Sequence, residues 1–76
     1  MAKIGLTVGQ KYRIHHRSQS QKYTRVSVMV FLGTTESDKQ ILFDARPVAG
    51  TQTMPREWVQ GIWPTSEPIS INERAR

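Results

Sequence analysis

Apolar and polar residues alternate along most of this 76-residue chain, and that period of two predicts β-strands. The pattern is clearest over residues 23–32. One face of that segment carries Thr24, Val26, Val28, Val30 and Leu32, and we expect it to be the core face. The opposite face begins polar and ends in Met29 and Phe31, a change typical of a long, bent strand in a small barrel.

The same alternation predicts shorter strands over residues 4–8, 11–17, 40–46, 51–54, 59–63 and 69–72. In the 40–46 segment, Ile41, Phe43 and Ala45 form the expected buried face. The turn formers of residues 33–39 join this strand to the preceding one as a hairpin, and Pro47 ends its pairing. Pro55 is suited to open a single 3₁₀ or α-helical turn near residues 55–58.

These elements predict an all-β fold, a small SH3-like barrel of about five to seven short antiparallel strands with one 3₁₀ turn. We expect a single domain over residues 1–72 and a flexible tail over 73–76. A chain of 76 residues buries a modest core, and without cysteine it has no disulfide or thiolate metal site. Homo-oligomerisation is one way in which such a thin core could be completed.

No apolar run approaches the roughly 20 residues of a membrane span, and the first residues lack the apolar core of a signal peptide. We therefore expect a cytoplasmic protein that does not associate with membranes.

Charge divides the chain sharply. Residues 1–35 contain six basic residues and no acidic one, because the first carboxylate is Glu36. Residues 36–76 contain five basic and six acidic residues, and the whole chain carries a net charge of +5. Such a division indicates a surface directed at a polyanion or at an acidic partner.

Much of the early charge falls on alternate residues of the predicted strand over 11–17. Lys11, Arg13, His15 and Arg17 would line one face at a spacing of about 6.6 Å, with Lys22 and Arg25 beyond the next loop. Tyr23 could stack on a base. Cations combined with an aromatic ring are typical of single-stranded nucleic-acid binding. The predicted nucleic-acid-binding residues are Lys11, Arg13, Arg17, Lys22, Tyr23 and Arg25. The alternative is an ordinary solvated face, whose charges also protect an edge strand from aggregation.

The segment over 54–64 contains two tryptophans and suggests a second kind of function. Trp58 and Trp63 would face opposite ways on a continuous strand, whereas a helical turn over 55–58 would let Trp58 cap the barrel while Trp63 packs elsewhere. Both could be core residues. Alternatively, one could anchor a protein interface, for which the candidate residues are Met29, Phe31, Arg56, Trp58 and Trp63.

Catalysis and metal binding find little support in the residues. His15 and His16 are adjacent, so on a strand they point to opposite faces and cannot chelate one ion together. No P-loop, GxGxxG, HExxH or nucleophile-elbow pattern occurs. We expect a non-enzymatic protein with no catalytic residue, metal or cofactor.

Two short elements resemble SH3 domains. Pro55-x-x-Trp58-Val59 is similar to the Pro-x-x-Tyr-Val element, in which a 3₁₀ turn precedes the last barrel strand, and Leu42-Phe43-Asp44 is similar to the Leu-Tyr-Asp of the SH3 signature. Only about ten residues separate the two elements here, and the acidic loop that binds arginine is missing. The resemblance therefore implies an SH3-like barrel over residues 8–63, without proline-peptide binding.

In size and basicity the chain also resembles small accessory proteins of bacteriophages. That likeness implies a host or virion protein as the partner and the host cytoplasm as the location.

Overall fold

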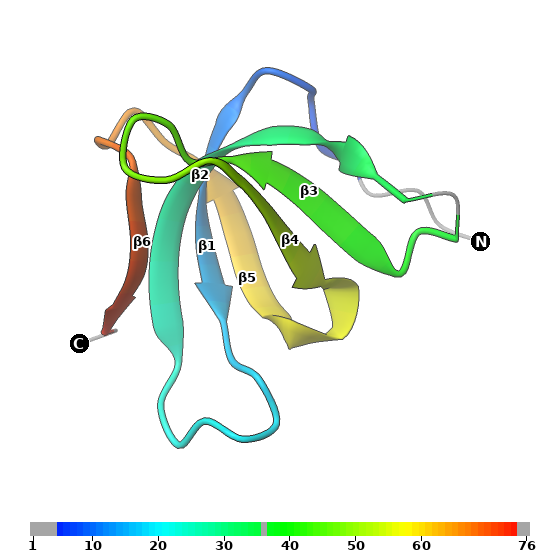
Figure 1. The fold of residues 1–76 in the computed structure, drawn as a ribbon, viewed down its shortest axis with the longest axis vertical. Helices are drawn as coiled ribbons and strands as arrows, with labels where there is room; N and C mark the ends of the chain where they lie inside the picture. Colours follow the sequence, from blue (N-terminus) through cyan, green and yellow to red (C-terminus); the bar gives the residue numbers. More distant parts are fainter. Residues whose placement is uncertain (1–4, 36, 75–76) are drawn as a thin grey trace.

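The structure is a computed structural model that describes residues 5–35 and 37–74. It is all-β, as predicted, with six antiparallel strands in one sheet and a single 3₁₀ turn among these residues (Figure 1). The elements are β1 (Lys11–His16), β2 (Arg25–Thr34), β3 (Gln40–Asp44), β4 (Thr51–Pro55), η1 (Arg56–Trp58), β5 (Val59–Pro64) and β6 (Ser70–Arg74).

The sheet is a meander that turns back on itself. Its strand order is β4-β3-β2-β1-β5, so β5 pairs with β1, and the 3₁₀ turn η1 carries the chain from β4 to β5. Pro55 precedes this turn with φ −58°, close to the angle that proline imposes at the start of a helical turn. The predicted turn near 55–58 is therefore confirmed.

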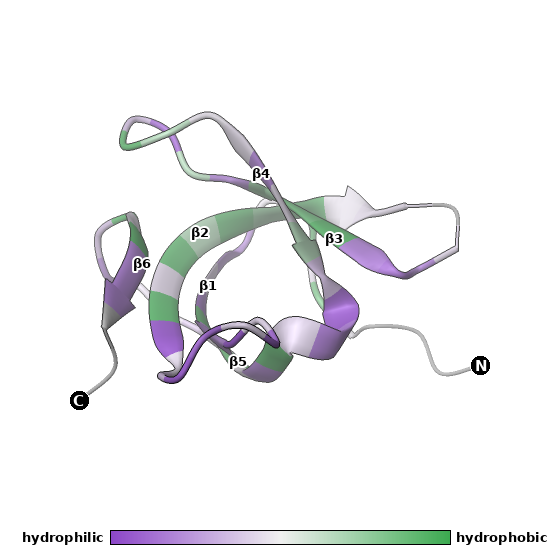
Figure 2. Cartoon of the chain, turned by 60° about the horizontal axis from the view of Figure 1, so that its bottom comes forward, coloured by the Kyte–Doolittle hydropathy of each residue, from purple (hydrophilic) through white to green (hydrophobic). Residues whose placement is uncertain are grey.

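Strand β2 holds the sheet together because it has three partners. One edge pairs with β1; the other pairs with β6 along Arg25–Val28 and with β3 from Val30 to Thr34. The register shifts between Phe31 and Gly33, where φ of Gly33 is 148°. Figure 2 shows β2 curving around the sheet, which confirms the predicted long, bent strand.

The core lies on the inner side of this curved sheet. It consists of the buried residues Tyr12, Ile14, Met29, Phe31, Ile41, Phe43, Ala45 and Met54. The Phe31 ring packs edge-on against Tyr12, with centroids 6.4 Å apart, and against Phe43, with centroids 6.3 Å apart. The predicted buried face of the third strand is thus confirmed.

The expected core face of β2 is confirmed only in part, because Val26 and Val28 are buried but the main core cluster lies on the other face of the strand. Register pairs Met29 with Tyr12 and Ser27 with Ile14, so Met29, Phe31 and Ser27 lie on the core side. Val26 and Val28 are buried on the opposite face, but Leu32 is 40 % exposed. A period of two shows which residues share a face and cannot show which face is covered.

Several element boundaries also differ from the sequence prediction. The expected strand over 4–8 is absent from its described residues, 5–8: Val8 and Gly9 form a turn, with φ of Gly9 at 87°. Ile4 lies outside the described residues. The last strand, β6, continues through Arg74, and residues 75–76 are not described.

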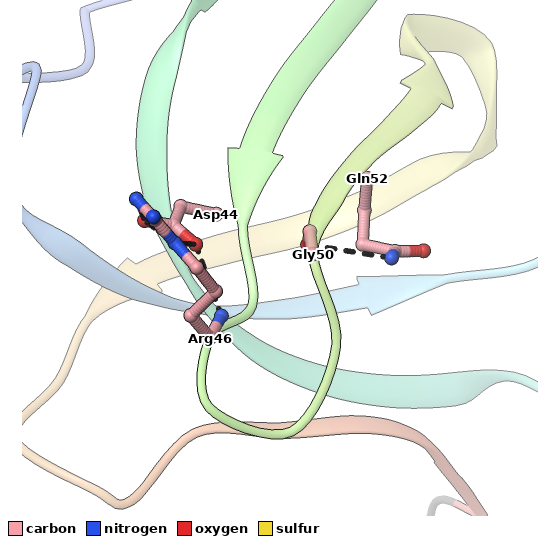
Figure 3. Close-up of polar contacts among 4 residues, drawn as sticks. All are labelled: Asp44, Arg46, Gly50 and Gln52. Atoms are coloured by element: carbon pink, nitrogen blue, oxygen red, sulfur yellow. Dashed lines mark hydrogen bonds and ion pairs between the residues drawn. The ribbon is translucent and has the colours of Figure 1, made fainter.

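Strand β3 ends at Asp44 rather than at Arg46. The Asp44 carboxylate accepts hydrogen bonds from the Arg46 backbone N–H at 3.0 Å and from its guanidinium at 2.9 Å (Figure 3). The Ala45 N–H donates to the Gly50 carbonyl at 3.2 Å and closes the loop. This local ion pair explains the direction of two pKa shifts: hydrogen bonds from Arg46 lower the pKa of Asp44, and that of Arg46 is raised.

Candidate functional site

The basic face of β1 forms as the alternation predicts. Lys11, Arg13 and His15 are partly exposed, while Tyr12, Ile14 and His16 between them are buried. The two adjacent histidines therefore point to opposite faces, as expected for a strand.

The cations on this face are already engaged by the chain itself. The Lys11 ammonium donates to the Glu67 carbonyl at 2.7 Å, and the Arg13 guanidinium pairs with the Glu67 carboxylate at 3.1 Å. Arg13 Nε also contacts the His15 ring at 3.2 Å. Glu67, in the connector between β5 and β6, thus neutralises part of the positive charge that the sequence predicted to be available for a ligand. Both members of the ion pair are roughly half-exposed, so the pair itself contributes little stability.

Trp63 lies on this same face, beside the basic residues. Register places Trp63 opposite Arg13 and Gly61 opposite His15. The indole lies over Gly61: a β-carbon added there would be 2.6 Å from Cη2 of the ring. The His15 ring meets the indole edge-on, with centroids 4.7 Å apart. Trp63 nevertheless remains 49 % exposed.

Trp58 lies elsewhere, at the end of η1, and packs half-buried against the core. The predicted separation of the two tryptophans by a helical turn is confirmed.

The loop between β1 and β2 carries a second group of cations. Arg17, Lys22 and Tyr23 are exposed, and Arg25 is the partly buried first residue of β2. The ion pairs found among the described residues involve Arg13 and Arg46, and none involves Arg17, Lys22 or Arg25. In Figure 1 this loop extends away from the sheet at the bottom of the view.

Hydrogen bonds at both ends and within the loop shape it. The Arg17 N–H donates to the Trp58 carbonyl at 2.9 Å, and the Thr24 hydroxyl donates to the Gln60 side chain at 2.7 Å. Within the loop, the Ser18 N–H donates to the Gln21 side chain at 3.1 Å. The loop is therefore anchored to η1 and β5 where it leaves and re-enters the sheet.

The six residues predicted to bind nucleic acid do not form one patch. Arg25 pairs in register with His16, whose side chain is buried, whereas Arg13 pairs with Val28. Residues paired directly across antiparallel strands share a face, so Arg25 lies on the face opposite to Arg13. The expectation that Arg25 extends the β1 patch is corrected. Two groups result: Lys11 and Arg13 on the outer face, and residues 17–25 at the loop.

The residues proposed for a protein interface are also divided. Met29 and Phe31 are only 2 % and 5 % exposed and belong to the core, so they cannot contribute to a surface of the folded chain. Arg56 is partly buried, and its guanidinium donates to the Asp38 carbonyl at 3.5 Å. Among the five, Trp63 alone presents a large exposed apolar surface.

Sequence reasoning missed a buried polar pair. His16 Nε2 and the Ser27 hydroxyl are 2.8 Å apart, and the Asn72 N–H donates to the same hydroxyl at 2.9 Å. Burial, followed by the nearby charges of His15 and Arg25, lowers the pKa of His16. The residues come from three strands, and no spacing in the sequence signals their meeting; only the polar Ser27 within an apolar strand hints at it.

Comparisons with protein-family models, with curated proteins and with solved structures found no match to this chain. No helix in the described part of the chain is long and apolar enough to cross a membrane. Across residues 5–35 and 37–74, no group of three or more His, Cys, Asp or Glu side chains could hold a metal ion.

Proposed function

We propose that this chain is a non-enzymatic module that binds single-stranded nucleic acid through the loop over residues 17–25. The observation that supports it is the combination in one anchored loop of three cations and an exposed aromatic ring. Arg17, Lys22 and Arg25 have no ion pair among the described residues, and Tyr23 is 53 % exposed. Cations that follow the backbone and a ring on which a base stacks are the usual components of such sites.

The charge of the whole chain favours the same ligand. The net charge of +5 attracts a polyanion, and the first 35 residues contribute no carboxylate. Lys11 and Arg13 contribute less to the attraction of a polyanion than two free cations would, because both already contact Glu67. The binding surface is therefore assigned to the loop rather than to strand β1.

Salt dependence measured by fluorescence anisotropy tests the proposal with a labelled 12-nucleotide single strand. With three phosphate contacts on a single strand, the logarithm of the binding constant falls with the logarithm of the salt concentration at a slope of about −2. Raising the salt from about 50 to about 200 mM should therefore weaken binding about twentyfold. Lys22→Gln reduces the slope by about 0.7. Lys39→Gln, which removes an exposed cation from a different loop, leaves the slope unchanged. Absence of binding at about 50 mM salt overturns the proposal.

A protein-interaction function is the second candidate, and the exposure of Trp63 favours it. The indole is 49 % exposed although Gly61 and His15 hold it in place, and tryptophan is among the residues that dominate interfaces. A pull-down with wild type and Trp63→Ala tests this candidate. A protein retained by wild type and lost in the variant supports it, whereas co-purified nucleic acid without a protein partner counts against it.

A further inference from the structure

A cavity of about 160 Å³ opens on the core side of the sheet, between β4 and β6. His16 and Ser27 are 4 % and 1 % exposed and belong to its inner wall. Thr53 and Asn72, which also line it, are exposed. Trp58 supplies an aromatic wall. Elsewhere the core is packed from aliphatic and aromatic side chains, so a polar hollow here is distinctive.

The polar groups of this cavity come from different strands. Asn72 has φ 53°, in the left-handed region that asparagine tolerates, and its N–H donates to the Ser27 hydroxyl at 2.9 Å. That hydroxyl lies 2.8 Å from His16 Nε2. Gln52 pairs in register with the buried Phe43, which places it on the core side of β4. Its amide nitrogen donates to the Gly50 carbonyl at 3.4 Å, and its amide oxygen has no such contact in Figure 3.

His16 keeps a ring nitrogen available to a ligand. Among the described residues, every fully buried side-chain nitrogen or oxygen has a hydrogen-bond partner. In His16, the ring nitrogen Nε2 has the Ser27 hydroxyl as its partner. The remaining nitrogen, Nδ1, makes no hydrogen bond with the described residues and therefore reaches accessible space. The lowered pKa of His16 favours the neutral ring, which has one donor and one acceptor.

We propose that this cavity receives a single-ring base, a pyrimidine, from the nucleic-acid strand that the 17–25 loop holds. The inference rests on the proposed function. A cavity of about 150 Å³ accommodates benzene, a single ring, whereas a two-ring purine needs more room. Trp58 provides a surface for base stacking, and His16 and Gln52 provide hydrogen-bonding groups for the edge of the base. Unstacked bases are recognised in this way in single strands.

The loop and the cavity are adjacent, so one nucleotide can use both. Arg25 lies in register with His16, and its charge contributes to the lowered pKa of that ring. Arg17 follows His16 in sequence, and its N–H bonds to the carbonyl of Trp58. A base in the cavity thus brings its phosphate to the loop cations. Phosphate contacts would set the position of the strand, and the cavity would supply the preference for a base.

The experiment compares 12-nucleotide oligothymidylate with oligoadenylate by fluorescence anisotropy at one low salt concentration. We expect wild type to prefer oligothymidylate about tenfold, within the range that one stacked base contributes. Ile71→Phe, which fills the cavity, and Gln52→Leu, which removes an amide from it, should each abolish the preference. Gln10→Leu, an equivalent change at the far end of β1, retains it.

A second readout does not depend on the folding of those variants. Trp63→Phe leaves Trp58 as the single tryptophan, and its emission should be quenched by oligothymidylate more than by oligoadenylate. Equal affinity for the two strands, with no change in Trp58 emission, overturns the cavity proposal while leaving loop binding intact. Failure of wild type to bind either strand overturns the proposed function and the cavity proposal with it.

Discussion

Replacing Gly61 with alanine tests the packing of Trp63 on strand β5. The added β-carbon would lie 2.6 Å from Cη2 of the indole and 3.1 Å from Cζ2 and Cζ3, closer than van der Waals contact. The backbone of Gly61 is not in the left-handed region, so alanine itself fits the strand. The indole must therefore move, and it loses its contact with His15, whose ring centroid is 4.7 Å away.

The size of the effect follows from the covered area. Trp63 is 49 % exposed, so roughly 100 Å² of the ring is covered, which is worth about 2.5 kcal/mol as an upper bound. Displacement forfeits most of that, about 1.5–2 kcal/mol. The glycine-to-alanine change itself stabilises by about 0.4–1 kcal/mol, because it restricts the unfolded chain. We expect Gly61→Ala to lower the free energy of unfolding by about 1 kcal/mol.

A double-mutant cycle separates the two contributions. Without the indole, in a Trp63→Val background, Gly61→Ala should stabilise the protein by about 0.4–1 kcal/mol. The coupling between the two positions is then about 1.5–2 kcal/mol, within the range for residues in contact. Urea unfolding followed by tryptophan fluorescence measures this coupling. Gly50→Ala serves as a control, because no heavy atom lies within 4 Å of its added β-carbon. Equal stabilisation in both backgrounds would refute the packing of Trp63 on Gly61.

Three further predictions concern the core and the titratable groups. Phe43→Ala, at a residue that is 0 % exposed, should cost about 3–5 kcal/mol in urea unfolding, whereas Leu32→Ala should cost under about 1 kcal/mol; similar losses would contradict the assigned core face. Because the pKa of His16 is lowered in the folded state, the unfolded state binds more protons, so the free energy of unfolding should fall as the pH decreases below 6.5. Urea midpoints between pH 5 and 8 measure this dependence, and His16→Gln should make it flatter. Glu67→Gln should change stability by less than about 1 kcal/mol, since its pair with Arg13 is solvent-exposed; a loss above about 2 kcal/mol in thermal unfolding would show that the pair is shielded.

The candidate site was only partly predictable, because contacts with residues far away in the sequence decide which of its cations remain available. The loop residues Arg17 and Lys22 are exposed where the sequence placed them. Arg13 is paired with Glu67, which is 54 residues away, and no local pattern predicts that contact. Arg25 shares an alternating strand with apolar residues, but its register with β1 decides the face on which it lies.

The buried pair of His16 and Ser27 was unpredictable for a similar reason. Its two members are 11 residues apart, and the Asn72 N–H that completes the arrangement comes from β6. Two adjacent histidines on a basic strand do not indicate that one of them lines a cavity.

By itself, the sequence determined most of the secondary structure of this protein, although the strand expected over 4–8 is absent from residues 5–8 and several strand ends differ. Alternation is a local property of a strand, so the positions of β1 to β6 and the turn at Pro55 follow from neighbouring residues. Tertiary structure alone decided which face of β2 joins the main core cluster, how the cations are paired and where Trp63 lies. Those features depend on the register and curvature of strands far apart in the chain, and a period of two is the same for either face.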